Sequence, residues 1–141
     1  MERLTDTDRA YFAGLVDGCG SIRVQRRMGG KTVVCREIIL TLSGLSKKAV
    51  RWVEERFQGV HTGVKNTPSR GVVMWRITFQ TRWAATALAH VAEFLKIKES
   101  EARLVFRFAD ATSQRGVRLS SEQMRVRAEV DHELSALQRS R

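Results

Sequence analysis

Residues 11–22 read Tyr-Phe-Ala-Gly-Leu-Val-Asp-Gly-Cys-Gly-Ser-Ile. Apolar and small residues recur here at helical spacing, and Asp6, Thr7 or Asp8 is suited to cap the start of a helix. The glycines near the end of the stretch interrupt this pattern, and the residues after them alternate as in a strand. The stretch therefore predicts a short helix that runs directly into a β-strand.

Two glycines mark one face of the predicted helix. Gly14 and Gly18 are four residues apart, so they share a face and leave the backbone bare enough for a second helix to approach closely. The alternative interpretation is an ordinary core helix that ends in a glycine.

The same stretch resembles the LAGLIDADG signature of homing endonucleases. The identical letters of the nine-residue signature are Ala13, Gly14, Leu15, Asp17 and Gly20, and the conservative replacements are Phe12, Val16 and Gly18. The resemblance implies a DNA endonuclease whose signature helix pairs with the same helix of a second subunit. A chain with one signature would then act as a homodimer, with Phe12, Gly14 and Gly18 at the dimer interface.

Cys19 departs from the signature at the position that matters most. In this family the eighth letter is the acid that binds the catalytic divalent cation, so the resemblance places a Mg²⁺ site at the Cys19 side chain and the Gly18 backbone carbonyl. Mg²⁺ prefers hard oxygen ligands, so we expect its binding to be weakened and cleavage to be impaired. Asp17, two positions back on the helix, is expected to point elsewhere. A soft metal held by the Cys19 thiolates of two subunits is an alternative.

Two further catalytic residues follow from the resemblance. Residues 94–98 read Phe-Leu-Lys-Ile-Lys and resemble the basic segment of the family, which makes Lys98 the candidate that stabilises the cleavage transition state. Ser46 falls where single-signature members carry a polar residue that orients solvent, although serine is shorter than the glutamine expected there. Without the signature, Lys98 could equally be a solvated loop cation.

The composition favours a polyanionic partner. The chain has 141 residues, with 25 Lys and Arg against 15 Asp and Glu, a net charge of +10 and a pI near 10.8. The length predicts one domain over residues 1–141, with a core over about 7–111 and a helical extension over about 119–139. No signal peptide or membrane-spanning stretch is evident, so we expect a soluble, intracellular protein without membrane contact. Cys19 and Cys35 make neither a disulfide framework nor a zinc site.

Alternating residues predict two β-hairpins. The first joins residues 21–28 to about 32–43 through a turn at Gly29-Gly30, and the second spans residues 60–80 and turns around 68–71. The expected core-facing residues are Ile22, Val24, Met28, Val34, Ile38, Leu40, Leu42, Val73, Trp75, Ile77 and Phe79.

Charge is segregated on these hairpins. They hold one acid, Glu37, and eight basic residues: Arg23, Arg26, Arg27, Lys31, Arg36, Lys65, Arg70 and Arg76. A solvated sheet face usually mixes both signs, so this pattern favours nucleic-acid contact. Arg suits guanine and Gln suits adenine in the major groove. The expected base contacts come from Arg23, Gln25, Arg27 and Arg76, and the expected phosphate contacts from Lys31, Lys65 and Arg70. The predicted DNA-binding set also includes Ser21, Glu37, Thr41, Ser43 and Met74.

Helical patterns separate and follow the hairpins. They cover residues 47–57, 81–95 and 99–111, with Thr81 as the expected cap of the second. A last helix follows Leu119, where Ser120 and Gln123 fit a capping box, and we interpret it as a packing or DNA-flanking addition. The resemblance then implies an α+β, αββαββα fold with additional C-terminal helices, a saddle-shaped antiparallel sheet and a homodimer.

These observations predict a homodimer that binds double-stranded DNA sequence-specifically and cuts it weakly or not at all. Either the nuclease activity was lost while DNA binding was kept, or the acid was replaced to trap an uncut complex. Two rival functions use the same scaffold, a DNA-binding transcriptional regulator and an intron RNA maturase. RNA is therefore the alternative partner.

Overall fold

The expected alternation of helices and hairpins is present in the computed structural model, which describes residues 3–67, 72–112 and 117–140. For residues 65–67 and 72–73 it describes the backbone only. The elements are α1 (Asp6–Cys19), β1 (Gly20–Gly29), β2 (Thr32–Leu45), α2 (Lys47–Arg56), β3 (His61–Thr67), β4 (Val72–Gln80), α3 (Thr81–Val91), the short 3₁₀ helix η1 (Ala92–Phe94), α4 (Glu99–Asp110) and α5 (Ser121–Arg139). The predicted α+β fold, with helices added after the second hairpin, is confirmed.

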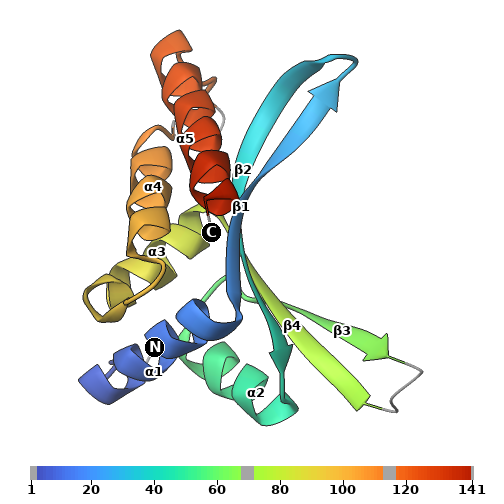
Figure 1. Cartoon of the computed structure of the whole chain (residues 1–141), viewed down its shortest axis with the longest axis vertical. Helices are drawn as coiled ribbons and strands as arrows, with labels where there is room; N and C mark the ends of the chain where they lie inside the picture. The colour runs from blue at the N-terminus through green and yellow to red at the C-terminus, as the bar shows by residue number, and fades with distance from the viewer. Residues whose placement is uncertain (1–2, 68–71, 113–116, 141) are drawn as a thin grey trace.

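The described strands form one twisted antiparallel sheet in the order β1-β2-β4-β3. The helices lie together on one side of this sheet, and the opposite face is not covered by any of the described helices (Figure 1). We call this opposite face the open face. It carries alternate residues of each strand, because successive side chains of a strand point to opposite sides.

The core lies between the sheet and the helices. Alternation correctly predicted the buried strand residues Ile22, Ile38, Leu40, Leu42, Ile77 and Phe79, each at most 1% exposed. Phe12 of the signature helix is fully buried among them; its ring stacks on Phe57 at a centroid distance of 4.2 Å and meets Phe79 edge-on at 6.1 Å. The prediction that Phe12 lies at a dimer interface is therefore wrong, because its side chain is enclosed within its own subunit.

The far end of the first hairpin departs from the prediction. Met28 and Val34, expected in the core, are 51% and 57% exposed. A bulge between Arg27 and Met28 shifts the alternation, and this end of the hairpin extends away from the helices (Figure 1). The turn lies one residue later than expected, where Gly30 adopts a φ of +66° that favours glycine. Val73 belongs to the residues whose side chains are not described.

Two helix caps also differ from the prediction. The cap of α1 is Thr5, which forms a capping box with Asp8, so Asp6 and Thr7 are not the cap. Helix α3 begins after Gln80, and the Thr81 hydroxyl instead accepts a hydrogen bond from the Ile38 backbone N–H at 3.0 Å. Thr81 therefore ties the start of α3 to strand β2.

Helix α5 is fastened to the back of the first hairpin. Its predicted capping box of Ser120 and Gln123 is present. Arg26 and Arg36 face each other across β1 and β2, and both donate to the buried carboxylate of Asp131, Nε to Oδ2, at 2.6 Å and 3.0 Å. Hydrogen bonding to Asp131 also raises the pKa of the Arg26 guanidinium. None of the helices within residues 3–67, 72–112 and 117–140 is long and apolar enough to cross a membrane.

Asp131→Asn is expected to destabilise the protein by about 2 kcal/mol. The substitution removes the negative charge that lies between the guanidinium groups of Arg26 and Arg36. It also replaces one acceptor oxygen by an N–H donor that faces a guanidinium. Urea denaturation followed by circular dichroism measures the change. Glu122→Gln, which breaks an exposed ion pair with Arg125 on the same helix, is the control and should change the free energy of unfolding much less, because solvent screens this pair. Equal effects of the two substitutions would contradict the role of Asp131.

Candidate nucleic-acid interface

The open face of β1 carries the predicted polar side chains. Ser21, Arg23, Gln25 and Arg27 are all exposed, while Ile22 between them is buried against the helices. Alternation therefore assigned this strand correctly up to the bulge. A basic strand on an uncovered sheet face can enter a DNA groove, where Arg and Gln side chains pair with base edges.

The neighbouring strands continue this surface. Ser21 lies opposite Thr41 on β2, Thr41 lies opposite Thr78 on β4, and Gln25 lies opposite Glu37. Glu37 and Ser43 are exposed, and Thr41 is half-buried. The acid next to Gln25 gives the surface an acceptor, which can bind the amino group of cytosine.

A polar hollow of about 450 Å³ lies on this side of the sheet. It is lined by Gln25, Arg26, Arg27, Cys35, Glu37 and Gln80. Gln80 was not predicted from the sequence, although it continues the outward alternation of Met74, Arg76 and Thr78 by two residues. Ile39 lies between Arg23 and Gln80 in the sheet. It is an apolar residue among polar ones and is only 3% exposed.

The second hairpin contributes Arg76 and Met74. Arg76 is exposed and lies opposite Gly63 on β3, where a Cβ atom would lie 3.9 Å from the Arg76 Nη2 atom. The Arg76 guanidinium therefore lies beside Gly63 on the neighbouring strand, at a distance that a Cβ atom would also tolerate. Met74 is half-buried. Arg70 and the side chain of Lys65 lie outside the described residues, so their predicted phosphate contacts stay predictions.

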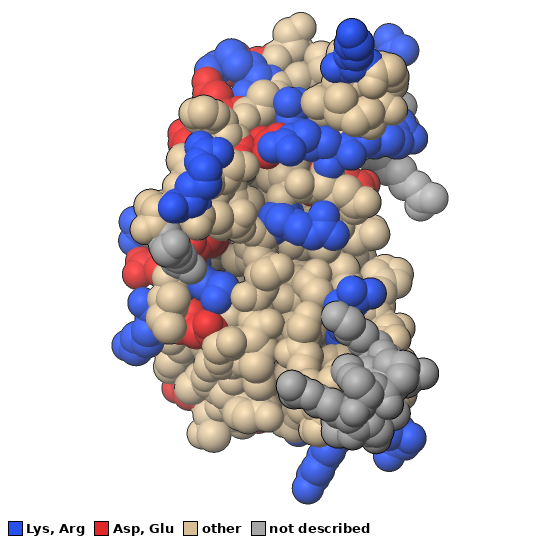
Figure 2. Space-filling view, turned by 45° about the vertical axis from the view of Figure 1, so that its right-hand side comes forward, with Lys and Arg blue, Asp and Glu red and all other residues tan. Residues whose placement is uncertain are grey.

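Not every basic residue of the hairpins is free to contact DNA. Arg26 and Arg36 are bound to Asp131 on the helix side, as described above. The remaining basic residues with described side chains are Arg23, Arg27, Lys31 and Arg76, all exposed. Figure 2 shows Lys and Arg gathered on this side of the molecule, whereas Asp and Glu lie mostly along the edge formed by the helices. The surface is basic even without the two arginines that bind Asp131.

Cys19 and the contact of Lys98 with α1 both lie in the last turn of the helix. Cys19 is exposed at the last position of α1, directly before the open-face strand β1. The Lys98 ammonium donates to the Asp17 backbone carbonyl at 3.0 Å, two residues from Cys19. The Asp17 carboxylate accepts from the backbone N–H groups of Lys96 at 2.8 Å and Lys98 at 3.0 Å. Asp17 therefore fixes the loop that carries Lys98 to the end of α1.

Ser46 does not join this group. Its hydroxyl accepts from the Ala49 backbone N–H at 3.2 Å and caps α2. It lines a hollow with Thr7, Asp8 and Tyr11 from the first half of α1. Tyr11 and Cys19 are separated by about 12 Å along the helix at 1.5 Å per residue. The structure gives Ser46 a capping role and does not place it beside Cys19 within one chain.

The donor set at the end of α1 does not fit Mg²⁺. Cys19 offers a sulfur atom, Gly18 offers only its backbone carbonyl, and the two oxygens of Asp17 already accept backbone hydrogen bonds. In the part of the chain that the structure describes, no group of three or more His, Cys, Asp or Glu side chains could hold a metal ion. Mg²⁺ requires oxygen ligands in octahedral geometry, which these residues do not supply.

The outer face of α1 is uncovered. Gly14 and Gly18 are exposed, and a Cβ atom on either would have no atom within 4 Å. Tyr11 on the same face is 48% exposed, with its ring edge-on to Trp52 at 4.7 Å. A backbone this bare allows another helix to pack closely against it.

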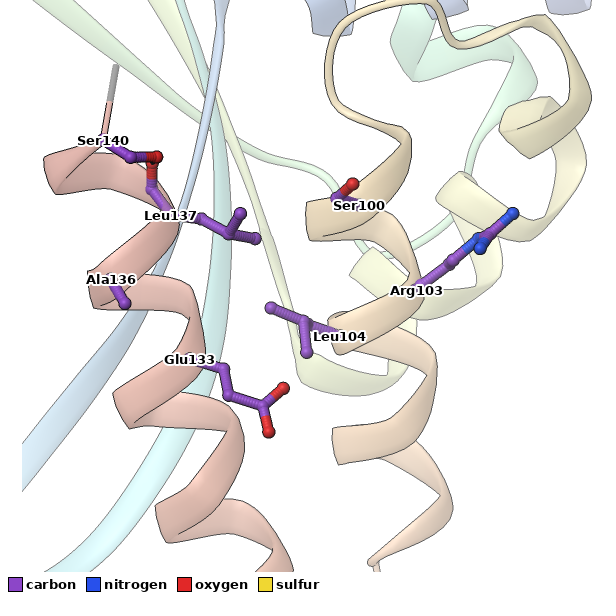
Figure 3. Close-up of a pocket in the computed structure, with 7 residues that line it drawn as sticks. All are labelled: Ser100, Arg103, Leu104, Glu133, Ala136, Leu137 and Ser140. Carbon is purple, nitrogen blue, oxygen red and sulfur yellow. The ribbon is translucent and has the colours of Figure 1, made fainter.

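A further hollow of about 520 Å³ lies between α4 and α5, within the helix layer (Figure 3). Leu104 and Leu137 point toward each other across it. Its charged residues already have partners: Glu133 binds Arg107 at 3.0 Å, and Arg103 binds Glu99 at 2.6 Å. We assign no function to this hollow.

Comparisons with known proteins identify the architecture. No family model and no curated protein sequence matches the chain. Among solved structures, the archaeal intron-encoded homing endonuclease I-Vdi141I, complexed with DNA, matches with a TM-score of 0.74 and 14% identity over 93% of this chain and 84% of that one. I-CvuI, complexed with its target, matches with a TM-score of 0.66, 16% identity and coverage of 93% and 82%. The LAGLIDADG homing endonuclease I-SmaMI, bound to cleaved DNA, matches with a TM-score of 0.63, 16% identity and coverage of 96% and 48%. The chain therefore has the fold of the LAGLIDADG homing endonucleases.

Proposed function

We propose that this chain binds double-stranded DNA sequence-specifically through the open face of its sheet. The observation that carries the proposal is the row of exposed Arg23, Gln25 and Arg27 on a sheet face that the helices leave uncovered. These side chains suit base edges, and the net charge of +10 favours a polyanion. I-Vdi141I and I-CvuI share this fold. The solved structure of I-Vdi141I is a complex with DNA, and that of I-CvuI is a complex with its target.

The proposed functional unit is a homodimer formed through α1. The support is the bare face at Gly14 and Gly18 and the exposed ring of Tyr11. If the α1 helices of two subunits packed around a twofold axis, the two sheets would form one longer basic surface. The two Cys19 side chains would then lie near each other. Such a dimer would read two half-sites with opposite orientation.

Mg²⁺-dependent cleavage of both strands is the activity we propose for the scaffold, and we expect it to be strongly reduced in this chain. Lys98 would stabilise the reacting phosphate, and the support is that its ammonium donates to the Asp17 carbonyl near the end of α1. The acid that would bind the cation is replaced by Cys19, and the remaining donors do not supply the oxygen ligands. The protein would then bind DNA better than it cuts it.

The two rival functions separate in a binding assay. A transcriptional regulator would share the DNA preference and lack cleavage altogether, whereas a maturase would prefer structured RNA. We expect a random-sequence duplex to bind more tightly than a structured intron RNA of equal charge at matched salt, measured by fluorescence anisotropy. The opposite preference would favour the maturase and contradict the proposed function.

Substitutions on the open face should divide into two classes. Arg23→Ala, Gln25→Ala and Arg76→Ala should each cost about 1–3 kcal/mol at a bidentate base contact and relax the preference at particular bases. Lys31→Ala, at the hairpin turn, should instead weaken binding to all duplexes alike and lower the salt dependence. Affinities measured against a panel of single-base variants of the bound duplex distinguish the two classes. Uniform losses for all four substitutions would mean that the sheet contacts only the DNA backbone.

A further inference from the structure

We propose that helix α5 sets part of the DNA sequence preference of this chain, because its Asp131 carboxylate holds strand β1 in the position from which Gln25 and Arg27 meet the bases. The inference rests on the proposed binding of DNA through the open face and goes beyond it. Asp131 is only 4% exposed and lies on the helix side of the sheet, so it does not meet DNA itself. Its role is that of a positioning residue.

Strand β1 depends on support from behind. It is the edge of the sheet, with a neighbouring strand on one side only. Its inner half is held by the core, where the buried Ile22 lies opposite the buried Leu40. The apolar cover ends before the outer half, where Met28 follows a bulge and is 51% exposed. Gln25 and Arg27 belong to this outer half, so their positions depend on what holds the strand behind them.

Arg26 is the point at which the outer half is held. It lies between Gln25 and Arg27 in the chain and points to the opposite side of the strand. Its Nε and Nη2 atoms donate to separate oxygens of Asp131, and such a bidentate pair fixes direction as well as distance. Arg36, its partner on β2, donates to the same carboxylate at 3.0 Å. One buried acid therefore ties both strands at the level of the reading side chains.

Helix α5 is itself fixed in place, so it can serve as an anchor. Arg127, one turn before the carboxylate, donates to the Ala111 carbonyl at 2.9 Å and to the Thr112 hydroxyl at 2.7 Å, directly after α4. Its guanidinium also donates to a backbone carbonyl of β2 at 3.2 Å. Near the other end of the helix, the Gln138 amide donates to the Ile22 carbonyl on β1. The helix is thus bound to both strands of the hairpin behind the open face (Figure 1).

Loss of this anchor would change base recognition more than it changes attraction to DNA. A base edge is read by hydrogen bonds of fixed distance and direction, whereas phosphate contacts carry no sequence information. Without the tie to Asp131, Gln25 and Arg27 would keep their polar groups and lose their fixed position. Arg76 on β4, two strands away from β1, would keep its place. The preference should therefore be lost at some bases and kept at others.

The test measures the preference base by base. Fluorescence anisotropy gives the affinity of each protein for a duplex selected from a random library and for its single-base variants. Gln25→Ala and Arg76→Ala identify the base that each of these side chains reads. In Asp131→Asn, discrimination at the Gln25 base should fall about tenfold, and discrimination at the Arg76 base should change by less than about twofold.

Two further variants separate position from charge. Arg26→Met breaks the same tie and lowers the net charge, whereas Asp131→Asn raises it, so an equal loss at the Gln25 base in both does not come from charge. Glu133→Gln raises the net charge as Asp131→Asn does but breaks only an ion pair between α5 and Arg107 on α4, so it should leave both preferences unchanged. Circular dichroism under the assay conditions shows that each variant is folded, and Arg26→Met provides the test if Asp131→Asn does not fold.

The outcomes separate this inference from the proposed function. Equal losses at the Gln25 and Arg76 bases would mean that Asp131 acts through stability alone, and they overturn the inference. Unchanged preference in both Asp131→Asn and Arg26→Met also overturns it, as does a loss in Glu133→Gln equal to that in Asp131→Asn. The proposed function stands in each of these cases. A wild-type protein without preference at any base overturns the proposed function and the inference together.

Discussion

Cys19→Asp is expected to give the protein Mg²⁺-dependent cleavage of both DNA strands, at a rate on the order of 100-fold or more above the wild type. The substitution places a carboxylate at the exposed end of α1, where the Lys98 ammonium already lies against the Asp17 carbonyl at 3.0 Å. A carboxylate from each subunit of a dimer would supply the hard oxygen ligands that the thiol does not. Conversion of a supercoiled plasmid that carries the bound sequence to nicked and linear forms measures the effect.

Two controls assign the new activity to this site. Cys19→Asn, which adds no charge, should not cleave, and Lys98→Ala in the Cys19→Asp background should slow cleavage more than it weakens binding in Mg²⁺. A Cys19→Asp protein that binds its duplex in Mg²⁺ within a few-fold of the wild type but never nicks it would contradict our view that the other active-site groups are in place. The lack of cleavage would then be attributed first to Ser46, because its hydroxyl caps α2 and does not orient solvent.

Gly14→Leu is expected to convert a dimer into a monomer. The four-carbon side chain would hold two α1 helices apart, since close helix packing depends on the missing Cβ atoms. The chain itself should stay folded, because a Cβ atom at Gly14 meets nothing within 4 Å and Leu favours a helix over Gly by about 0.8 kcal/mol. Sedimentation equilibrium at micromolar concentration measures the change.

The control for Gly14→Leu is Ala136→Leu, which adds an apolar side chain at an exposed position of α5 and should leave the dimer intact. Mild oxidation of the parent provides a second readout: Cys19 of two subunits should cross-link if their Cα atoms come within about 7 Å. Cross-linking through Cys35, or a parent that sediments as a monomer both with and without DNA, would show that α1 is not the interface.

The periodicity of the sequence predicted the strands well where a helix covers them. Ile38, Leu40 and Leu42 are fully buried, as their alternation with polar residues indicates. Val34 lies on the same strand and continues the same pattern, yet it is 57% exposed. Alternation shows which residues share a face, but it does not show where the covering layer of helices ends.

The number of basic residues available for DNA on the open face was overestimated for a related reason. Arg26 and Arg36 belong to the same hairpin as Arg23 and Arg27, and counting charges along the hairpin treats them as equivalent. Their partner Asp131 is 105 and 95 residues away in the chain, on a helix that pattern analysis could only describe as an addition. Such a distant ion pair is set by tertiary packing, so no local pattern indicates it.

The resemblance to the signature was more informative about the last turn of α1 than about which side chains of this helix are buried. It singled out Lys98, and in the structure the Lys98 ammonium donates at 3.0 Å to the backbone carbonyl of Asp17, two residues before Cys19. It did not anticipate that Phe12 would be enclosed in the core, since a motif lists residue types and not the direction of each side chain. The helical period alone puts Phe12 on the same face as Val16, which is also fully buried.

Selection of bound duplexes from a random library tests most directly whether the open face reads DNA sequence. The wild-type protein is incubated with the library at physiological salt, and the bound duplexes are recovered and sequenced over several rounds. We predict enrichment of one palindrome-like sequence with two half-sites, which remains uncut when Mg²⁺ is added. Recovery of duplexes with no shared sequence would contradict the central claim, because the protein would then hold only the DNA backbone.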